Sequence, residues 1–327
     1  MASGAIILSE LFMKRGIIGL LSVALLFGQN AKQKAASKAA PPADELSRIT
    51  VDVTRVNLLY TVTDKKGRFV SNLTKDDFEI LENKKQQKIL EFTAETDLPL
   101  RLAILIDTSN SIRERFRFIQ EAAINFVTTV MRPGKDRALV VSFDTSPELV
   151  ADLTDDQVAV TKAIRDLRPG GGTALYDAIF FSCRDVLMKD QPRDKFRRAV
   201  VVLSDGDDNQ SRWTREQALE MAHKADAVIY TISTNITHLE TNGDKVLKRY
   251  AEETGGIAFF PFKAEDMGQS FENIANELRH QYNVFYRPDP LRTDGLYHPV
   301  EIRVKERREL SVRARHGYYA PTLPQAP

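Results

Sequence analysis

Three short polar segments of this 327-residue chain carry the side chains that could do chemistry. They hold five candidate residues, namely Asp107, Ser109 and Ser111 in the first segment, Thr173 after a run of glycines in the second, and Asp205 before a glycine in the third. All the donor atoms are oxygens, without imidazole or thiol. Such a set suits Mg²⁺, with Mn²⁺ or Ca²⁺ as alternatives, whereas zinc or copper would recruit nitrogen or sulfur. The segments therefore predict a metal site.

The elements that must position these segments follow an α/β pattern. Apolar runs rich in Val and Ile alternate with stretches whose apolar residues recur every three or four positions, including one long helix over 112–130. This alternation predicts a mainly parallel sheet with helices on both faces, over the strands 101–106, 138–143, 199–203, 227–232 and 257–260. Parallel strands end at one edge of a sheet, so the three polar segments are expected to meet there.

The flanks of this α/β region have a different periodicity. Apolar and polar residues alternate in 48–62 and 78–92 before it, and in 282–286, 300–304 and 310–315 after it. A few strands alone leave one sheet face unburied, so we expect both flanks to pair into one β-sandwich-like domain into which the α/β domain is inserted. The predicted boundaries are 48–96 for the first flank, 97–281 for the α/β domain, 282–320 for the second flank and 321–327 for a tail.

The N-terminus resembles a secretory signal. Lys14 and Arg15 precede an apolar run over 17–27, which is too short for a typical membrane-spanning helix. We therefore predict a signal peptide or uncleaved anchor over 1–28, a flexible tether over 29–47, and a location outside the cytoplasm, secreted or in the periplasm or cell envelope. Translation from Met13 is an alternative start.

Composition narrows the range of partners. Lys+Arg 46 against Asp+Glu 45 gives a net charge of +1, so no global field attracts nucleic acid, and a membrane contact is expected only through an N-terminal anchor. The single cysteine, Cys183, excludes an intrachain disulfide and lies in an apolar-periodic segment, which favours a buried, inert thiol.

Taken in order, the three polar segments resemble the complete metal-ion-dependent adhesion site of von Willebrand factor type A (VWA) domains, as in integrin inserted domains, and the resemblance covers roughly 97–265. It implies that Ser109 and Ser111 bind the metal directly, and that Thr173 binds it directly or through water. It also implies that Asp107 and Asp205 act mostly through water. With neutral hydroxyls as direct ligands, the ion keeps much of its attraction for an external anion. An Asp or Glu of a protein partner could then complete the coordination.

A second resemblance concerns the flanks. Residues 67–78, Phe92 and the closing segment 313–321 are similar to a bacterial group of secreted VWFA-related proteins, most of which lack assigned functions. This resemblance bears on architecture and export more than on a ligand.

Each segment of the predicted site can also be explained without a metal. Ser111 with Glu114 could form a capping box, Thr173 could cap a helix, and Asp205 with Gly206 could form a simple turn. The loop of Asp207, Asp208 and Asn209 is expected to be a solvated acidic loop. Local roles do not explain why two carboxylates converge on one edge, where they would repel each other without a cation.

Three functions remain open. The first is a metal-dependent adhesion or assembly module that binds a protein and catalyses nothing, so no catalytic residue is assigned. The second is a metal-assisted hydrolase, which normally needs a general base or nucleophile near the ion; no Ser/His/Asp order or His-Glu-x-x-His motif is present. The third is a structural protein with an unused metal site.

Overall fold

A computed structural model describes residues 55–94, 97–192, 195–235, 237, 239–261, 263 and 266–322. The predicted signal and tether, and most of the predicted tail, lie outside the described residues. Within the described ranges, no helix is long and apolar enough to cross a membrane.

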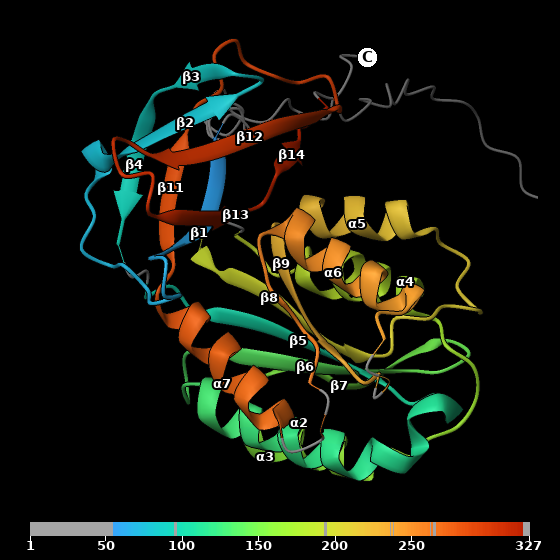
Figure 1. Ribbon diagram of the computed structural model, residues 1–327. Helices are drawn as coiled ribbons and strands as arrows, with labels where there is room; N and C mark the ends of the chain where they lie inside the picture. Colours follow the sequence, from blue (N-terminus) through green and yellow to red (C-terminus); the bar gives the residue numbers. More distant parts are fainter. Residues whose placement is uncertain are drawn as a thin grey trace, which may run out of the picture. The chain divides into compact units, whose positions relative to one another are not determined.

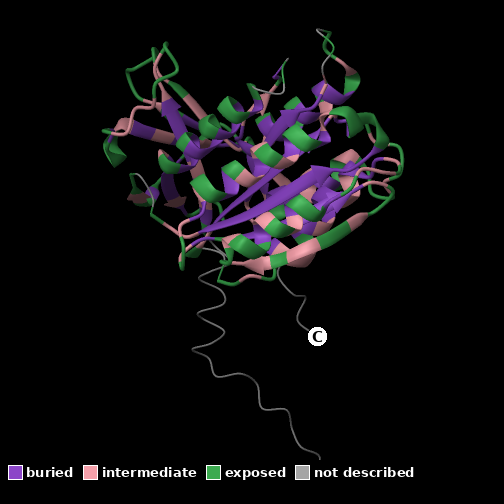
Figure 2. Ribbon diagram, turned by 90° about the horizontal axis from the view of Figure 1, so that it is seen from below, coloured by how far each residue is buried: buried purple, intermediate pink, exposed green. Residues whose placement is uncertain are grey.

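A six-stranded sheet forms the centre of the α/β region, in the order β10-β9-β8-β5-β6-β7 (Figure 1). Its strands are β5 (Leu100–Asp107), β6 (Arg137–Phe143), β7 (Pro147–Thr154), β8 (Arg197–Ser204), β9 (Ala227–Ser233) and β10 (Ala258–Phe259). Every residue of β5, β8 and β9 is buried, as expected for strands covered on both faces (Figure 2). The sequence did not predict β7, which pairs antiparallel with β6 at the sheet edge and is only partly buried.

Helices cover both faces of this sheet. One face carries α2 (Phe116–Val130), α3 (Gln157–Asp166) and α7 (Asp266–Arg279), and the other carries α4 (Leu175–Phe181), α5 (Arg215–Lys224) and α6 (Asn242–Thr254). Capping boxes at Thr214 and Thr241 start α5 and α6. The predicted α/β class is thus confirmed.

Two predicted helices are interrupted. The segment 112–130 is not one helix, because a 3-10 helix, η2 (Asn110–Arg115), precedes α2. The first residue of η2 is held by a contact outside the helix, since Asn110 N donates to the Gly171 carbonyl at 3.3 Å. Likewise α4 continues into a π-helical segment, η3 (Ser182–Leu187), which buries Cys183. Burial raises the pKa of this thiol to about 12, which makes it inert as predicted.

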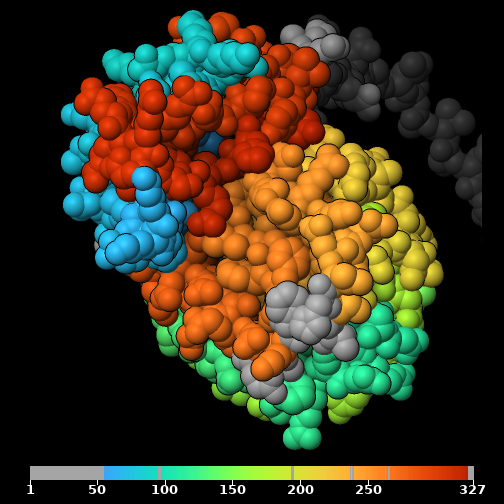
Figure 3. Space-filling model, viewed as in Figure 1, coloured from blue at the N-terminus to red at the C-terminus, as the bar shows by residue number. Residues whose placement is uncertain are grey.

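Both flanks contribute strands to the same two sheets. The first flank supplies β1 (Val56–Thr63), β2 (Phe78–Glu82), β3 (Lys85–Gln87) and β4 (Ile89–Thr93). The second supplies β11 (Tyr282–Tyr286), β12 (Tyr297–Val304), β13 (Ser311–Ala314) and β14 (Gly317–Tyr319). The sheets have the orders β13-β1-β11-β4 and β14-β12-β2-β3, and share one apolar core. Figure 3 shows blue and red residues in the same lobe. The predicted sandwich built from both flanks is thus confirmed.

One buried carboxylate and several partly buried charges join the sandwich to the α/β region. Arg315 donates to Asp226 Oδ1 at 2.5 Å and to the Asn57 carbonyl at 2.6 Å. Glu277 at the end of α7 accepts from Thr61 Oγ1 at 3.2 Å and lies 3.3 Å from the Arg313 guanidinium. Breaking one side of such a buried pair leaves the other charge uncompensated, so these contacts resist separation of the two regions.

Candidate metal centre

The first polar segment forms a compact hydrogen-bonded loop at the carboxyl end of β5. Asp107 is fully buried, with its Oδ1 accepting from Ser109 N at 2.8 Å and its Oδ2 accepting from Ser204 Oγ at 2.6 Å. The hydroxyls of Ser109 and Ser111 lie 2.8 Å apart in a hydrogen bond. The structure therefore brings the three predicted residues of this segment together and adds Ser204, which the sequence analysis missed although it immediately precedes Asp205.

The capping explanations for two hydroxyls are wrong. Ser111 lies inside η2, whose N-cap is Ser109 and has no side-chain cap bond. Thr173 is not a cap either, because the N-cap position of α4 belongs to Ala174. Neither hydroxyl is thus accounted for by helix capping.

The glycine-rich segment is fastened to the first segment through its backbone. Gly170 N donates to the Thr108 carbonyl at 2.5 Å, and Asn110 Nδ2 donates to the Gly171 carbonyl at 3.2 Å. Thr173, which follows, is 4% exposed. The backbone bonds of Gly170 and Gly171 therefore hold the segment that leads to Thr173 against the Asp107 loop.

Asp205 follows the last residue of β8 and so lies at the same edge of the sheet. The Ser204 hydroxyl that donates to Asp107 also accepts from Gly206 N at 3.0 Å, so the third segment is linked directly to the first. Gly206 has a φ of +82°, and a Cβ at this position would collide with the Gly243 carbonyl at the start of α6. Asp205 Oδ1 accepts from Asp207 N at 3.2 Å. The turn interpretation is therefore right for this segment, but the turn also sets Asp205 next to the Asp107 loop.

A positive charge would stabilise the ionised carboxylates of the site. Burial raises the pKa of Asp107 to about 6, and the nearby Asp205 carboxylate acts in the same direction, against the hydrogen bonds from Ser109 and Ser204. Burial and the charge of Asp205 also raise the pKa of Asp207. A divalent cation would remove the cost of these negative charges. Buried carboxylate and neutral hydroxyl oxygens thus fit a hard metal ion in both charge and chemistry.

The third segment continues into a loop in which Asp207 and Asn209 are exposed, as expected of a solvated loop, but which also braces the second segment. Asn209 Oδ1 accepts from Thr173 N at 3.0 Å, and Asn209 N donates to the Thr173 carbonyl at 3.0 Å. Asp208 Oδ2 accepts from Tyr176 N at 2.9 Å in the first turn of α4. The side chains of Asp208 and Asn209 therefore position Thr173. The sequence could not predict this role, because the spacing of these residues resembles that of any polar loop and their partners are far away in the chain.

We expect Asn209→Ala to weaken metal binding about three- to tenfold, because Thr173 N then loses its partner and the hydroxyl is no longer held in place; neutral hydrogen bonds contribute about 1 kcal/mol. Gln210→Ala is the matched control, since Gln210 contacts Thr173 through its backbone N at 3.1 Å. Isothermal titration with Mn²⁺ measures both variants. Equal affinities would show that the Asn209 side chain does not position the site.

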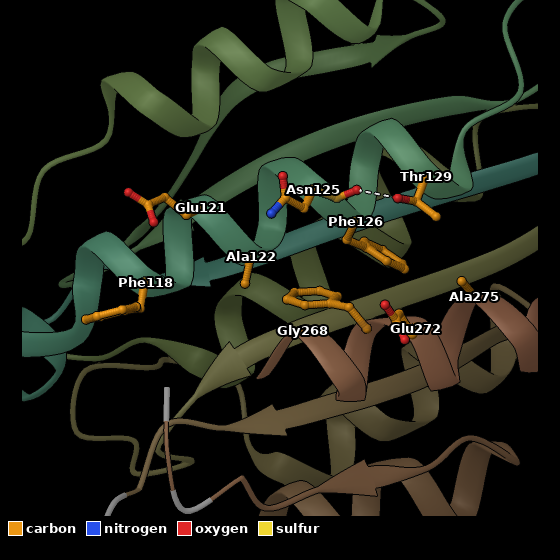
Figure 4. Close-up of a pocket in the computed structure, with 10 residues that line it drawn as sticks. Phe118, Glu121, Ala122, Asn125, Phe126, Thr129, Gly268, Glu272 and Ala275 are labelled. Carbon is orange, nitrogen blue, oxygen red and sulfur yellow. Dashed lines mark hydrogen bonds between the residues drawn. The ribbon is translucent and has the colours of Figure 1, made fainter. Parts of the chain in front are cut away.

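A groove on the described part of the chain lies elsewhere. It has a volume of about 270 Å³ and runs between α2 and α7, where Phe118, Phe126 and Phe271 line it with Glu121 and Glu272 (Figure 4). None of the five candidate residues lines this groove. Among the described residues, no three His, Cys, Asp or Glu side chains gather as a metal site. The candidate site differs in kind, because three of its five residues offer a hydroxyl and only two a carboxylate.

The open sheet and the hydroxyl–carboxylate cluster at its carboxyl edge define a class of α/β binding domain. Residues 102–207 match the family model of the von Willebrand factor type A domain, so this chain contains a VWA domain. It is 28% identical over 170 residues to the human von Willebrand factor A domain-containing protein 3B, covering 50% of this chain and 12% of that protein.

Solved structures give weaker likenesses. A von Willebrand factor type A protein from Catenulispora acidiphila is 14% identical with a TM-score of 0.48, covering 76% of this chain and 74% of that one. The proximal thread matrix protein 1 of the mussel byssus, solved with a zinc-occupied MIDAS motif, is 18% identical with a TM-score of 0.48, covering 59% and 48% of the two chains. Neither likeness carries a ligand over to this chain.

Proposed function

We propose that this VWA domain binds a divalent cation, Mg²⁺ in the first place, and uses it to capture an Asp or Glu side chain of a protein partner outside the cytoplasm. Ser109, Ser111 and Thr173 would hold the ion, with Asp107 and Asp205 supplying negative charge. The bound ion would supply a positive charge that attracts the partner's carboxylate. The observation that carries the proposal is the fully buried Asp107 carboxylate at a hydroxyl-lined edge, where a second carboxylate approaches it.

The arrangement favours binding over hydrolysis. A general base must contact the water molecule from which it takes a proton, whereas the Asp107 side chain is fully buried. Both oxygens of Asp107 already accept hydrogen bonds, one from Ser109 N and one from Ser204 Oγ. Asp107 is therefore suited to hold the loop and to neutralise an ion, and hydrolysis is the less favoured alternative.

A thermal melt tests the metal. If the folded site binds the ion and the unfolded chain does not, excess Mg²⁺ or Mn²⁺ should raise the melting temperature by several degrees. At an ion concentration of about one hundred times Kd, binding adds about 2.7 kcal/mol to the free energy of unfolding. EDTA should reverse the shift. An unchanged melting temperature with Mg²⁺, Mn²⁺ and Ca²⁺ would reject the metal-binding function and favour a purely structural VWA domain.

Partner capture tests the rest of the proposal. Immobilised wild-type protein, incubated with its own cell-envelope fraction in Mg²⁺, should retain a partner that EDTA releases. Ser109→Ala should lose this partner, because a direct ligand of the ion is missing. Ser146→Ala, which changes an exposed serine beyond β6, is the control and should retain it. Equal retention by Ser109→Ala and wild type would rule out capture through the metal.

The proposed location rests on the basic and apolar residues at 14–27. A chain exported through this segment should be found outside the cytoplasm, and deletion of 1–28 should retain it inside. Fractionation of cells that express the two forms distinguishes these results. Equal distribution of both forms would contradict export by this route.

A further inference from the structure

Ser204 is a buried serine that is not among the five residues of the proposed metal site. It is the last residue of β8, directly precedes Asp205, and has an exposed fraction of 0%. Its carbonyl accepts from Thr234 N at 2.9 Å, which continues the pairing of β8 with β9 to the end of the strand. The sheet therefore fixes the position from which the Ser204 hydroxyl reaches the site.

The two hydrogen bonds of the Ser204 hydroxyl have a defined direction. Gly206 N can only donate, so Ser204 Oγ accepts this bond, at 3.0 Å. A hydroxyl carries a single hydrogen, and an ionised carboxylate can only accept, so this hydrogen is donated to Asp107 Oδ2 at 2.6 Å. Ser204 thus joins the turn that carries Asp205 to the Asp107 carboxylate.

The Asp107 carboxylate is held at both oxygens. Ser109 N donates to Oδ1 at 2.8 Å, and Ser204 Oγ donates to Oδ2. With one donor alone the carboxylate could rotate about its Cβ–Cγ bond, because this torsion has no narrow minimum. Ser109 belongs to the same loop as Asp107, whereas Ser204 lies on a neighbouring strand. The Ser204 hydroxyl therefore fixes the plane of the carboxylate relative to the sheet.

The turn on the other side of Ser204 is supported by α6. A Cβ on Gly206 would collide with the Gly243 carbonyl, and a Cβ on Gly243 would collide with the Asp205 carbonyl. The first turn of α6 therefore lies directly against the backbone of the Asp205 turn. Ser204 thus connects two loops that are each braced by neighbouring elements, and its hydroxyl sets the spacing between them.

We propose that Ser204 is a positioning residue that makes the proposed metal site select Mg²⁺ over Ca²⁺. This role rests on the proposed function and adds a residue that determines which ion is bound. Mg²⁺ requires a nearly ideal octahedron with short bonds, whereas Ca²⁺ accepts longer bonds and variable geometry. A carboxylate held at both oxygens, at a fixed spacing from the Asp205 turn, favours the ion with the stricter geometry. Without the Ser204 hydroxyl the two loops can shift apart, and the site accommodates the larger ion.

Ser204→Ala should lower the affinity of the full chain for Mg²⁺ roughly tenfold, the lower end of the effect of losing a residue that orients a metal ligand. Its affinity for Ca²⁺ should stay within about threefold of wild type. Ser204→Thr keeps the hydroxyl and should bring the ratio of the two affinities to within about twofold of wild type. Ser142→Ala is the matched control and should leave both affinities unchanged, because Ser142 is a buried serine near the end of β6, on the other side of β5.

Titration calorimetry, with Mg²⁺ alone and with Ca²⁺ alone, measures the ratio of affinities. A residue that merely supported the fold would lower both affinities by the same factor, so an unchanged ratio in Ser204→Ala overturns the proposed role. A ratio that falls in Ser204→Ala and returns in Ser204→Thr supports it. If Ser204→Ala does not fold, Ser204→Cys replaces it, because a thiol of similar size is a weaker donor, and the same criteria apply. If wild type binds neither ion, the proposed function fails and the selectivity of Ser204 fails with it.

In EDTA at pH 8, a double-mutant cycle between Ser204→Ala and Asp107→Ala tests the contact without metal. Chemical denaturation should give a favourable coupling equivalent to at least a roughly tenfold change in the unfolding equilibrium constant, because a hydrogen bond to a charged group is stronger than one between neutral groups. The same cycle with Ser142→Ala should give none. Additive effects of Ser204→Ala and Asp107→Ala would show that Ser204 does not hold the carboxylate, and would overturn the proposed role even if wild type binds Mg²⁺.

Discussion

Asp107→Asn is expected to stabilise the metal-free protein at pH 8 and to abolish its stabilisation by Mg²⁺. Burial raises the pKa of Asp107 from 3.8 to about 6, so the folded state favours the protonated, uncharged form. Linkage makes the ionised carboxylate cost up to about 3 kcal/mol above pH 6, and asparagine removes this cost. Asparagine keeps an oxygen for Ser109 N but carries no charge for the ion.

The sign follows from the direction of the shift. A raised pKa in the folded state contributes stability that is complete below the unfolded value of 3.8 and is lost as pH rises through about 6. In EDTA, wild type and Asp107→Asn should therefore converge below pH 4 and separate above pH 6, with the variant more stable. Urea denaturation at both pH values measures the difference.

Magnesium should remove most of this difference at pH 8. Wild type gains the free energy of ion binding, about 2.7 kcal/mol at one hundred times Kd, and Asp107→Asn gains almost none. Asp166→Asn is the control, because Asp166 is an exposed helix residue 3.6 Å from Lys162 and should respond to Mg²⁺ like wild type. A variant that is still stabilised by Mg²⁺ as strongly as wild type would contradict the assignment of Asp107.

Protonation linked to His223 is expected to have the second large effect on the free energy of unfolding, below pH 7. His223 lies on α5, is 4% exposed, and its ring is 5.5 Å from that of Tyr297 and 6.3 Å from that of Tyr319. Burial, and next the charge of Arg315, lower the pKa of His223 from 6.5 to about 3. The folded state therefore favours neutral histidine, whereas the unfolded chain gains a proton below pH 6.5.

This depressed pKa costs stability as pH falls. Between pH 7 and pH 5, protonation of the unfolded chain at His223 should remove about 2 kcal/mol. Over the same range in EDTA, protonation of folded Asp107 should add about 1 kcal/mol, so wild type should change little. The two titrations thus oppose each other and single variants should separate them.

His223→Phe keeps a ring between the two tyrosines and removes the titration. Its stability in EDTA should rise from pH 7 to pH 5, because only the Asp107 effect remains, whereas that of Asp107→Asn should fall by about 2 kcal/mol. Denaturant titrations at five pH values would resolve these slopes. Parallel profiles for wild type and His223→Phe would show that His223 is not held neutral by the fold.

The sequence predicted those elements correctly whose side-chain pattern repeats regularly among residues close together in the chain. The strand predictions 101–106 and 138–143 lie inside β5 and β6, because a strand buried on both faces needs a continuous apolar run. The predicted strand 282–286 coincides with β11. Strand β7 was missed, because an edge strand is only partly buried and its pattern is weak.

The sequence by itself determined which oxygens the site offers and in what order, because residue type and position after a strand are local properties. Only the tertiary structure decided that Ser204 bonds to Asp107 and that Asn209 holds Thr173. It also decided the pairing of β1 with β11 and β13. The physical reason is that these contacts join residues far apart in the chain, and their partners are selected by the packing of the whole sheet.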